Sequence, residues 1–218
     1  MNLKNSRLYT KQLHYPLFLN ISGKSCIVMG GGKIAERKVA MLLKFNAEVK
    51  LISPKITGAL SKLSKSGKIE VIEREYEDGD LEGASLVFAA TNRREINERI
   101  KKEAQTKGIP VNVVDDPVLC DFIVPSIVKK GPIIIAVSTS GVLPSLSKKL
   151  RKEISEYITA DYIKYAHIIG KFRKLLIEKV ENRKKRAEIM AEISKTDMKE
   201  LINMSTKEIT AKFLKENR

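Results

Sequence analysis

The chain has few of the side chains that bind metals or form cross-links. Its 218 residues include two cysteines and two histidines, and no C-x-x-C pair occurs. A zinc or haem site built from local motifs is therefore not expected, and so few thiols agree with a reducing compartment. Cys26 falls in an apolar stretch and is expected in the core, whereas Cys120 falls in a loop and is expected to be a passive thiol.

Long apolar runs are also missing. No stretch approaches the roughly 20 residues that a membrane-spanning helix needs, and residues 1–7 lack the apolar core of a signal peptide. These absences predict a soluble, cytoplasmic protein with no membrane partner. Hydrophobic residues still make up 43% of the chain, which is enough for a core.

The net charge of +15 at pH 7 is divided almost evenly between residues 1–147 and 148–218. Such a spread favours a small polyanionic ligand or general solubility over a dense nucleic-acid surface. The local cluster at residues 183–186, Arg-Lys-Lys-Arg, is interpreted as the solvated face of a helix. Nucleic acid is therefore not expected as a partner; if the cluster did bind it, affinity would fall steeply with salt.

Residues 25–38 carry the most informative pattern, in which an apolar run leads through three glycines into a helical pattern. Gly30, Gly32 and Ala35 fill the small positions of the dinucleotide-binding motif G-x-G-x-x-G/A. A helix that begins here directs unpaired N–H groups and its positive dipole end at phosphates. We expect a nucleotide at this turn, held by Gly30, Gly31, Gly32, Lys33, Ile34 and Ala35. The alternative is a glycine-rich turn that only joins strand to helix.

The first 115 residues alternate between strand and helix patterns, which predicts an α/β fold with a Rossmann-like, doubly wound parallel sheet. Strands are expected at 25–30, 48–53, 69–72, 85–90 and 110–114, and helices at 33–45, 55–65 and 93–107. The fourth strand ends at Ala90 and Thr91, and we expect Thr91 to contact the cofactor, because such sheets bind ligands at the carboxyl ends of their strands.

The pattern changes after residue 115. Two apolar runs, 122–128 and 132–138, flank a short glycine turn and predict a small antiparallel strand pair. Helices are expected at 144–158, 160–180, 183–194, 197–203 and 206–216. The sequence thus predicts three parts: a Rossmann domain at 1–115, dimerisation strands with an active-site loop at 116–145, and a helical C-terminal domain at 146–218.

An acidic residue is missing where NAD-binding folds usually carry one to bind the ribose hydroxyls, near the end of the second strand. That position falls near Ser53, which is followed by Pro54 and Lys55. In one interpretation these three residues hold the adenosine end through backbone and hydroxyl contacts. In the other, Lys55 accepts the 2′-phosphate of NADP. The sequence leaves both open.

Asp115 is the candidate for proton transfer. It follows a predicted sheet strand at the edge where the redox half of a dinucleotide belongs, and a carboxylate there can accept a proton. The alternative role is a helix cap or turn former before Pro117, which is common for aspartate near proline.

Six segments, read together, resemble the precorrin-2 dehydrogenase/sirohydrochlorin ferrochelatase family of sirohaem synthesis, whose members occur alone or as the N-terminal part of sirohaem synthase. The resemblance covers residues 14–155 well and the helical tail loosely. The segments are Tyr15-Pro-Leu-Phe-Leu-Asn20, Gly30-Gly-Gly-Lys-Ile-Ala-Glu-Arg-Lys38, Ala89-Ala-Thr91, Asn112-Val-Val-Asp115, Phe122-Ile-Val-Pro-Ser126 and Ala136-Val-Ser-Thr-Ser-Gly141.

The resemblance implies a homodimer with interlocking central segments that uses NAD to oxidise precorrin-2 to sirohydrochlorin. It implies that Asp115 is the key carboxylate and that Asn112, Ser138, Thr139 and Ser140 contact the tetrapyrrole. The family's serine in Val-Ser-Ser-Gly-Gly is Thr139 here, which keeps a hydroxyl, and Ser140 replaces the first glycine. Some relatives also insert ferrous iron, and the sequence leaves that second activity open.

The rival function is a non-enzymatic, NAD-binding redox sensor or regulator. Such a protein would use the same glycine turn but would need neither Asp115 nor the segment 138–141. Turnover of precorrin-2 distinguishes the two functions.

Overall fold

The computed structural model describes residues 14–215, and the chain divides between Val124 and Pro125 into two compact units. Residues 1–7 and residue 216, the predicted end of the last helix, lie outside the described part. The three-part division expected from the sequence is finer than these two units, and its boundaries stay a prediction. Among residues 14–215, no helix is both long enough and apolar enough to cross a bilayer.

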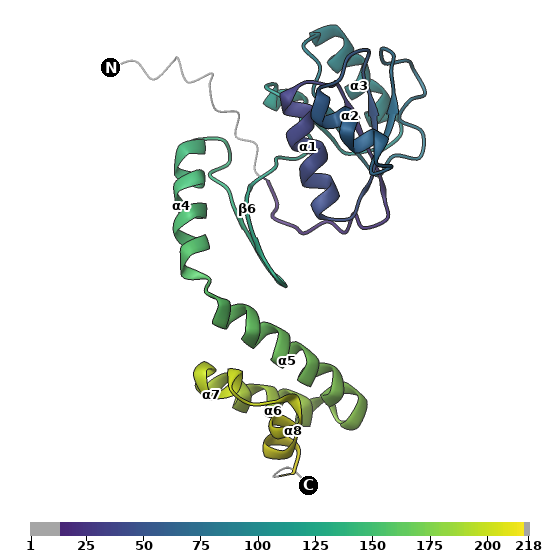
Figure 1. Cartoon of the computed structure of the whole chain (residues 1–218). Helices are drawn as coiled ribbons and strands as arrows, with labels where there is room; N and C mark the ends of the chain where they lie inside the picture. The colour runs from purple at the N-terminus through teal and green to yellow at the C-terminus, as the bar shows by residue number, and fades with distance from the viewer. Residues whose placement is uncertain (1–13, 216–218) are drawn as a thin grey trace, which may run out of the picture. The chain divides into compact units, whose positions relative to one another are not determined.

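The first unit is built on a five-stranded parallel sheet in the order β3-β2-β1-β4-β5. This order confirms the predicted Rossmann-like fold, in which the chain reverses direction across the sheet between β1 and β4. The elements, of which Figure 1 labels the three α-helices, are β1 (Ser25–Met29), α1 (Lys33–Lys44), β2 (Glu48–Ile52), α2 (Gly58–Lys65), β3 (Glu70–Ile72), β4 (Leu86–Ala89), α3 (Arg94–Thr106), β5 (Val111–Val113) and the short 3₁₀ helix η2 (Pro117–Leu119).

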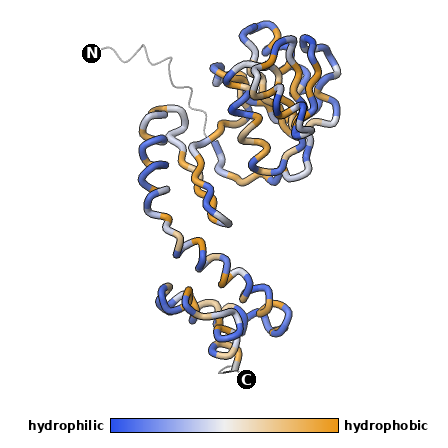
Figure 2. The backbone as a smooth tube through the Cα atoms, in the orientation of Figure 1, coloured by the Kyte–Doolittle hydropathy of each residue, from blue (hydrophilic) through white to orange (hydrophobic). Residues whose placement is uncertain are grey.

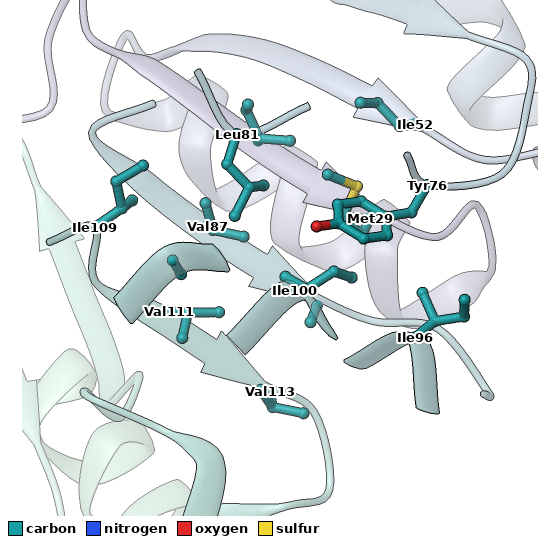
Figure 3. Close-up of a cluster of buried hydrophobic side chains, with 13 residues drawn as sticks. Met29, Ile52, Tyr76, Leu81, Val87, Ile96, Ile100, Ile109, Val111 and Val113 are labelled. Atoms are coloured by element: carbon teal, nitrogen blue, oxygen red, sulfur yellow. The ribbon is translucent and has the colours of Figure 1, made fainter. Parts of the chain in front are cut away.

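The strands are buried because alternate side chains enter two separate cores, one on each face of the sheet. One core joins the strands to α3 through Ile96, Ile100 and Ala104, and Figure 3 shows this cluster. The other joins them to α1 and α2, and Ala35 and Leu60 are completely buried there. Because both faces of the sheet are covered, these strands appear in the sequence as continuous apolar runs.

Helix α2 begins at Gly58, three residues later than predicted, because Thr57 caps it. The Thr57 hydroxyl accepts a hydrogen bond from Leu60 N at 3.3 Å and donates one to Glu36 Oε2 of α1 at 2.8 Å. Its backbone N–H donates to Gly31 O at 3.0 Å. One residue therefore ties the start of α2 to α1 and to the glycine turn.

We expect Thr57→Ala to lower the free energy of unfolding by about 1 kcal/mol, the usual effect of deleting an N-cap side chain. Urea denaturation measures the loss, and Thr57→Ser, which retains the hydroxyl, is the matched control. A serine variant as unstable as the alanine variant would contradict the capping role.

The same contact makes the effect of Thr57→Ala depend on pH. The Thr57 hydroxyl, with Lys33 adding to it, holds the pKa of Glu36 below its ordinary value of 4.5. A lowered folded-state pKa stabilises the fold above the ordinary value and loses that effect as the pH falls through the folded-state pKa. The difference between the intact chain and Thr57→Ala should therefore shrink at acid pH.

The second unit begins with an antiparallel pair of strands and continues as helices. The predicted first strand at 122–128 is displaced, because Pro125 lacks an N–H for pairing and the strand starts after it. The elements are β6 (Ser126–Lys130), β7 (Ile133–Val137), α4 (Pro144–Tyr157), α5 (Ala160–Lys179), α6 (Arg183–Lys195), α7 (Met198–Ile202) and α8 (Thr206–Lys215). Helices α5 to α8 share a core centred on Phe172 and Phe213.

The strand pair β6–β7 is tied to the end of α4 by Lys130, whose ammonium donates to the carbonyl oxygens of Ser155 and Ile158 at 2.5 and 2.9 Å. Its isoleucines remain only partly buried within the single chain. In Figure 2, β7 and the start of β6 are coloured as an apolar segment, whereas α4 is predominantly polar. The pair thus leaves apolar surface that the rest of the second unit, as far as residue 215, does not cover.

Candidate functional site

A cavity of about 590 Å³ lies at the carboxyl ends of β1, β2 and β4. This is the position at which open α/β sheets bind ligands. The cavity is lined by residues 29–32, 52–57, 75–76, 90–93 and 96. The predicted cofactor residues Gly30, Gly31, Gly32, Ser53, Pro54, Lys55 and Thr91 are among them. The predicted residues Lys33, Ile34 and Ala35 follow directly in α1 but do not line the cavity.

The glycine turn is shaped by two close backbone contacts. A Cβ atom on Gly30, whose φ is +107°, would lie 2.4 Å from Ala90 O, and one on Gly31 would lie 2.0 Å from Lys55 O. Neither position tolerates a side chain without movement of the main chain. A Cβ atom on Gly32 would meet no atom within 4 Å. The first two glycines therefore form the turn, and the third keeps the space beside the helix start open.

Helix α1 begins at this turn with Gly32 as its N-cap and no side chain capping its first N–H groups. Lys33 is well exposed and pairs with Glu36. Ala35 is fully buried against the sheet, which is the close helix–strand packing expected of the third small residue in the motif. The start of α1 thus directs unpaired N–H groups and a positive dipole end at the cavity.

The loop after β2 forms one wall of the cavity. Ser53 is buried, and its hydroxyl donates to Lys55 O at 2.8 Å. Lys55 itself is exposed. No acidic residue occupies this loop, as the sequence indicated, so the wall offers a hydroxyl oxygen, backbone groups and one ammonium to a ribose.

An acidic residue that was not predicted for the site does reach the cavity, from the end of the neighbouring strand. Glu75 lies three residues after β3, and its carboxylate accepts two hydrogen bonds from the guanidinium of Arg93, both at 2.9 Å. Both residues line the cavity. A signal was available, because parallel strands end at the same sheet edge, so residues after β3 belong beside those after β2.

Thr91 connects the end of β4 to α3. Its hydroxyl donates to Asn97 Oδ1 at 2.7 Å and accepts from Arg93 N at 3.3 Å, while Asn97 Nδ2 donates to Thr91 O. Asn97 is buried. These contacts fix the loop that carries both Thr91 and Arg93 along the cavity.

Asp115 is exposed and lies two residues beyond β5, at the same sheet edge as the cavity. Its φ of +60° places it in the left-handed region, and Asp116 N donates to Val113 O across the turn at 3.4 Å. Aspartate and asparagine are among the few residues other than glycine that adopt this conformation readily. The backbone role of a turn former and the chemical role of a base are therefore compatible in one residue.

The segment after Asp115 is held by Asn112, which is buried, and by Cys120, which is partly buried. The Asn112 amide donates to Phe122 O at 2.9 Å, and Cys120 Sγ accepts from Val113 N at 3.2 Å. Burial raises the pKa of the Cys120 thiol, so the thiol stays protonated and is a poor nucleophile. Asn112 is buried and does not line the cavity. Its predicted contact with substrate stays a prediction.

Lys38 approaches the same region from α1, between one and two turns after the helix start. Its ammonium lies 5.0 Å from the centre of the Phe88 ring, and this ring packs edge-on against Phe122 at 5.5 Å. Burial lowers the pKa of Lys38 and the charge of Arg37 adds to this effect, while Cys120 and Asp115 raise it. Lys38 was not among the residues predicted for the site.

The predicted substrate residues Ser138, Thr139 and Ser140 lie in the second unit, between β7 and α4. The Thr139 hydroxyl lies 3.1 Å from the hydroxyl of buried Ser147 and accepts from Leu143 N at 3.2 Å. Ser140 has a φ of +50°, and its N–H donates to Ser138 Oγ at 3.0 Å. These hydroxyls order the turn before α4, and their role toward a ligand stays a prediction.

A family model described as "Putative NAD(P)-binding" matches residues 17–126, which include the whole sheet and the cavity. The chain belongs to this family. Membership agrees with the glycine turn and with the place of the cavity at the strand ends.

Curated relatives carry the name "Siroheme synthase", which confirms the resemblance found from the six segments. The protein from Methylobacillus flagellatus is 43% identical over 159 residues, which are 73% of this chain and 34% of that protein. The protein from Nitrosococcus oceani is 38% identical over 167 residues, or 77% of this chain and 36% of that protein. This NAD(P)-binding chain therefore spans about a third of the length of the curated relatives it matches.

A solved structure titled "SirC, precorrin-2 dehydrogenase" matches with a TM-score of 0.75 and 22% identity. The match covers 93% of this chain and 100% of that one. It therefore includes both the Rossmann-like unit and the helical unit. At this identity it establishes the shared fold of this NAD(P)-binding family member.

Proposed function

We propose that the chain is an NAD-dependent dehydrogenase that oxidises precorrin-2 to sirohydrochlorin in sirohaem synthesis. The observation that carries the proposal is the pairing of a glycine turn open at Gly32 with a carboxylate, Asp115, at the same sheet edge. The printed names of the siroheme synthase relatives and of SirC support this choice of substrate.

The residues at the turn fit a dinucleotide. The open space at Gly32 admits a pyrophosphate to the first N–H groups of α1, which no side chain caps. Ser53, Pro54 and Lys55 flank the adenosine end, and Thr91 lies on the opposite wall of the cavity. These residues are compatible with both interpretations of Lys55, as a contact to the adenosine of NAD or to the 2′-phosphate of NADP. The choice of NAD rests on the family resemblance.

The oxidation removes two hydrogens from the macrocycle, one as a hydride and one as a proton. When bound, the cofactor's nicotinamide accepts the hydride. The Asp115 carboxylate takes the proton, and its exposed position lets it pass that proton to solvent. The left-handed turn holds this carboxylate clear of the strand, and the partly buried contacts of Asn112 and Cys120 keep the turn in place.

Precorrin-2 carries eight carboxylates, a ligand that suits a chain with a net charge of +15. Positive potential raises the encounter rate with such a polyanion and supplies ion pairs. We assign Ser138, Thr139, Ser140 and Asn112 to the tetrapyrrole on the family resemblance.

A homodimer in the cytoplasm completes the proposal. An isolated two-stranded hairpin is marginally stable in water, and the partly buried isoleucines of β6–β7 suit a second copy of the chain. Light scattering on the purified chain measures the mass of the assembly; a monomer at working concentrations would rule out the dimer.

The proposed reaction is tested by mixing the chain with precorrin-2 and NAD without oxygen. One sirohydrochlorin should form for each cofactor reduced, and added ferrous iron tests whether the product is converted further to sirohaem. NAD binding without any oxidation of precorrin-2 would favour the sensor over the enzyme. Parallel titrations with NAD and NADP settle the choice that the missing acidic residue leaves open.

A further inference from the structure

Lys38 is a partly buried ammonium that lacks the usual partner. It is not fully solvated, because it lies over the Phe88 ring near the Phe88–Phe122 pair. Among residues 14–215, no carboxylate lies at ion-pair distance from it. Burying a cation without a paired negative charge raises the free energy of the folded chain. A ligand that brings a negative charge removes this cost.

The surroundings of Lys38 place it beside the proposed chemistry. Asp115 and Cys120 lie close enough to influence the charge of Lys38. Phe88 is the second-last residue of β4, and the residues that follow this strand line the cavity. Lys38 follows Lys33, at the start of α1, by about 7 Å along the helix axis. One helix therefore presents its N-terminus to the cavity and an ammonium toward the Asp115 turn.

We propose that Lys38 binds a carboxylate of the tetrapyrrole and so fixes the macrocycle beside Asp115. This proposal rests on the proposed function, since the ligand is its substrate. The ammonium supplies a charge-assisted hydrogen bond to a side-chain carboxylate of the ring. The ammonium lies 5.0 Å from the centre of the Phe88 ring, and the ligand provides the close ion-pair partner that residues 14–215 do not.

The alternative is a purely structural role, in which the aliphatic part of the Lys38 side chain packs on the Phe88 ring and the ammonium binds no ligand. The two roles respond differently to substitution. Lys38→Met keeps the apolar cover and removes the charge, whereas Lys38→Arg keeps the charge. Arg37→Gln, at the exposed neighbouring position, removes an equal charge from the same helix and is the matched control.

The test measures equilibrium binding of sirohydrochlorin by its absorbance, without oxygen, so that no turnover is needed. We expect Lys38→Met to weaken binding roughly ten- to hundred-fold, the value of one charge-assisted hydrogen bond, with NAD binding unchanged. Lys38→Arg should recover much of the loss, and Arg37→Gln should bind close to the intact chain.

Two results would overturn the assignment of Lys38: binding by Lys38→Met as tight as that of the intact chain, or an equal loss in Arg37→Gln. Neither would touch the proposed function, which depends on turnover of precorrin-2 by the intact chain. Conversely, if the intact chain binds sirohydrochlorin through Lys38 but never oxidises precorrin-2, the proposed dehydrogenase activity is wrong and the proposed binding site stands.

Discussion

Replacing Asp115 with asparagine should lower the rate of precorrin-2 oxidation by roughly 10²–10⁴-fold, the range expected when a general base is removed. Asparagine has nearly the same shape and adopts the left-handed conformation that the φ of +60° requires. The turn should therefore survive while the proton acceptor is lost. Alanine is a poorer choice, because it would add backbone strain to the chemical change.

The measurement is steady-state turnover with precorrin-2 and NAD, together with a separate titration of NAD. Affinity for NAD should stay unchanged, because Asp115 does not line the cavity. Asp116→Asn is the control, since it removes the same charge one residue away, where the nearest basic group is Arg94 at 3.9 Å. If D115N turned over at nearly the rate of the intact chain, another group would have to accept the proton.

The parts of the site that the sequence predicted are those set by local structure. Gly30 and Gly32 are recognisable because a strand, a tight turn and a helix follow one another without a gap. Gly30 has a steric reason in its approach to the Ala90 carbonyl, whereas Gly32 leaves the space beside the helix start open. The parallel strands are recognisable because burial on both faces removes the polar alternation. The displaced start of β6 shows the limit, since an apolar run does not say where pairing begins around Pro125.

The parts that were missed depend on which strands and faces become neighbours. Glu75 and Arg93 are 18 positions apart and meet only because β3 and β4 end at the same edge of the sheet. Lys38 ends one of the segments that carry the family resemblance, but its position over Phe88 depends on how α1 packs against β4. No local pattern around either residue encodes that packing.

Substitutions at the glycine turn should separate folding from binding. Gly30→Ala should lower the free energy of unfolding by about 2–5 kcal/mol, because its Cβ would lie 2.4 Å from a carbonyl oxygen at a φ of +107°. Gly32→Ala should leave stability almost unchanged, because the residue is extended, with a φ of −84°, and its Cβ meets no atom.

The same Gly32→Ala variant should bind NAD roughly 10- to 100-fold more weakly, because the added methyl group occupies the space through which a pyrophosphate reaches the helix start. Urea denaturation and a cofactor titration on the same preparations measure both effects. Gly170→Ala, at an exposed helical position with open space around it, is the control for a glycine outside the site. A Gly32→Ala chain that folds and binds NAD like the intact one would place the phosphates elsewhere and would leave the glycine turn without its role in the proposed dehydrogenase.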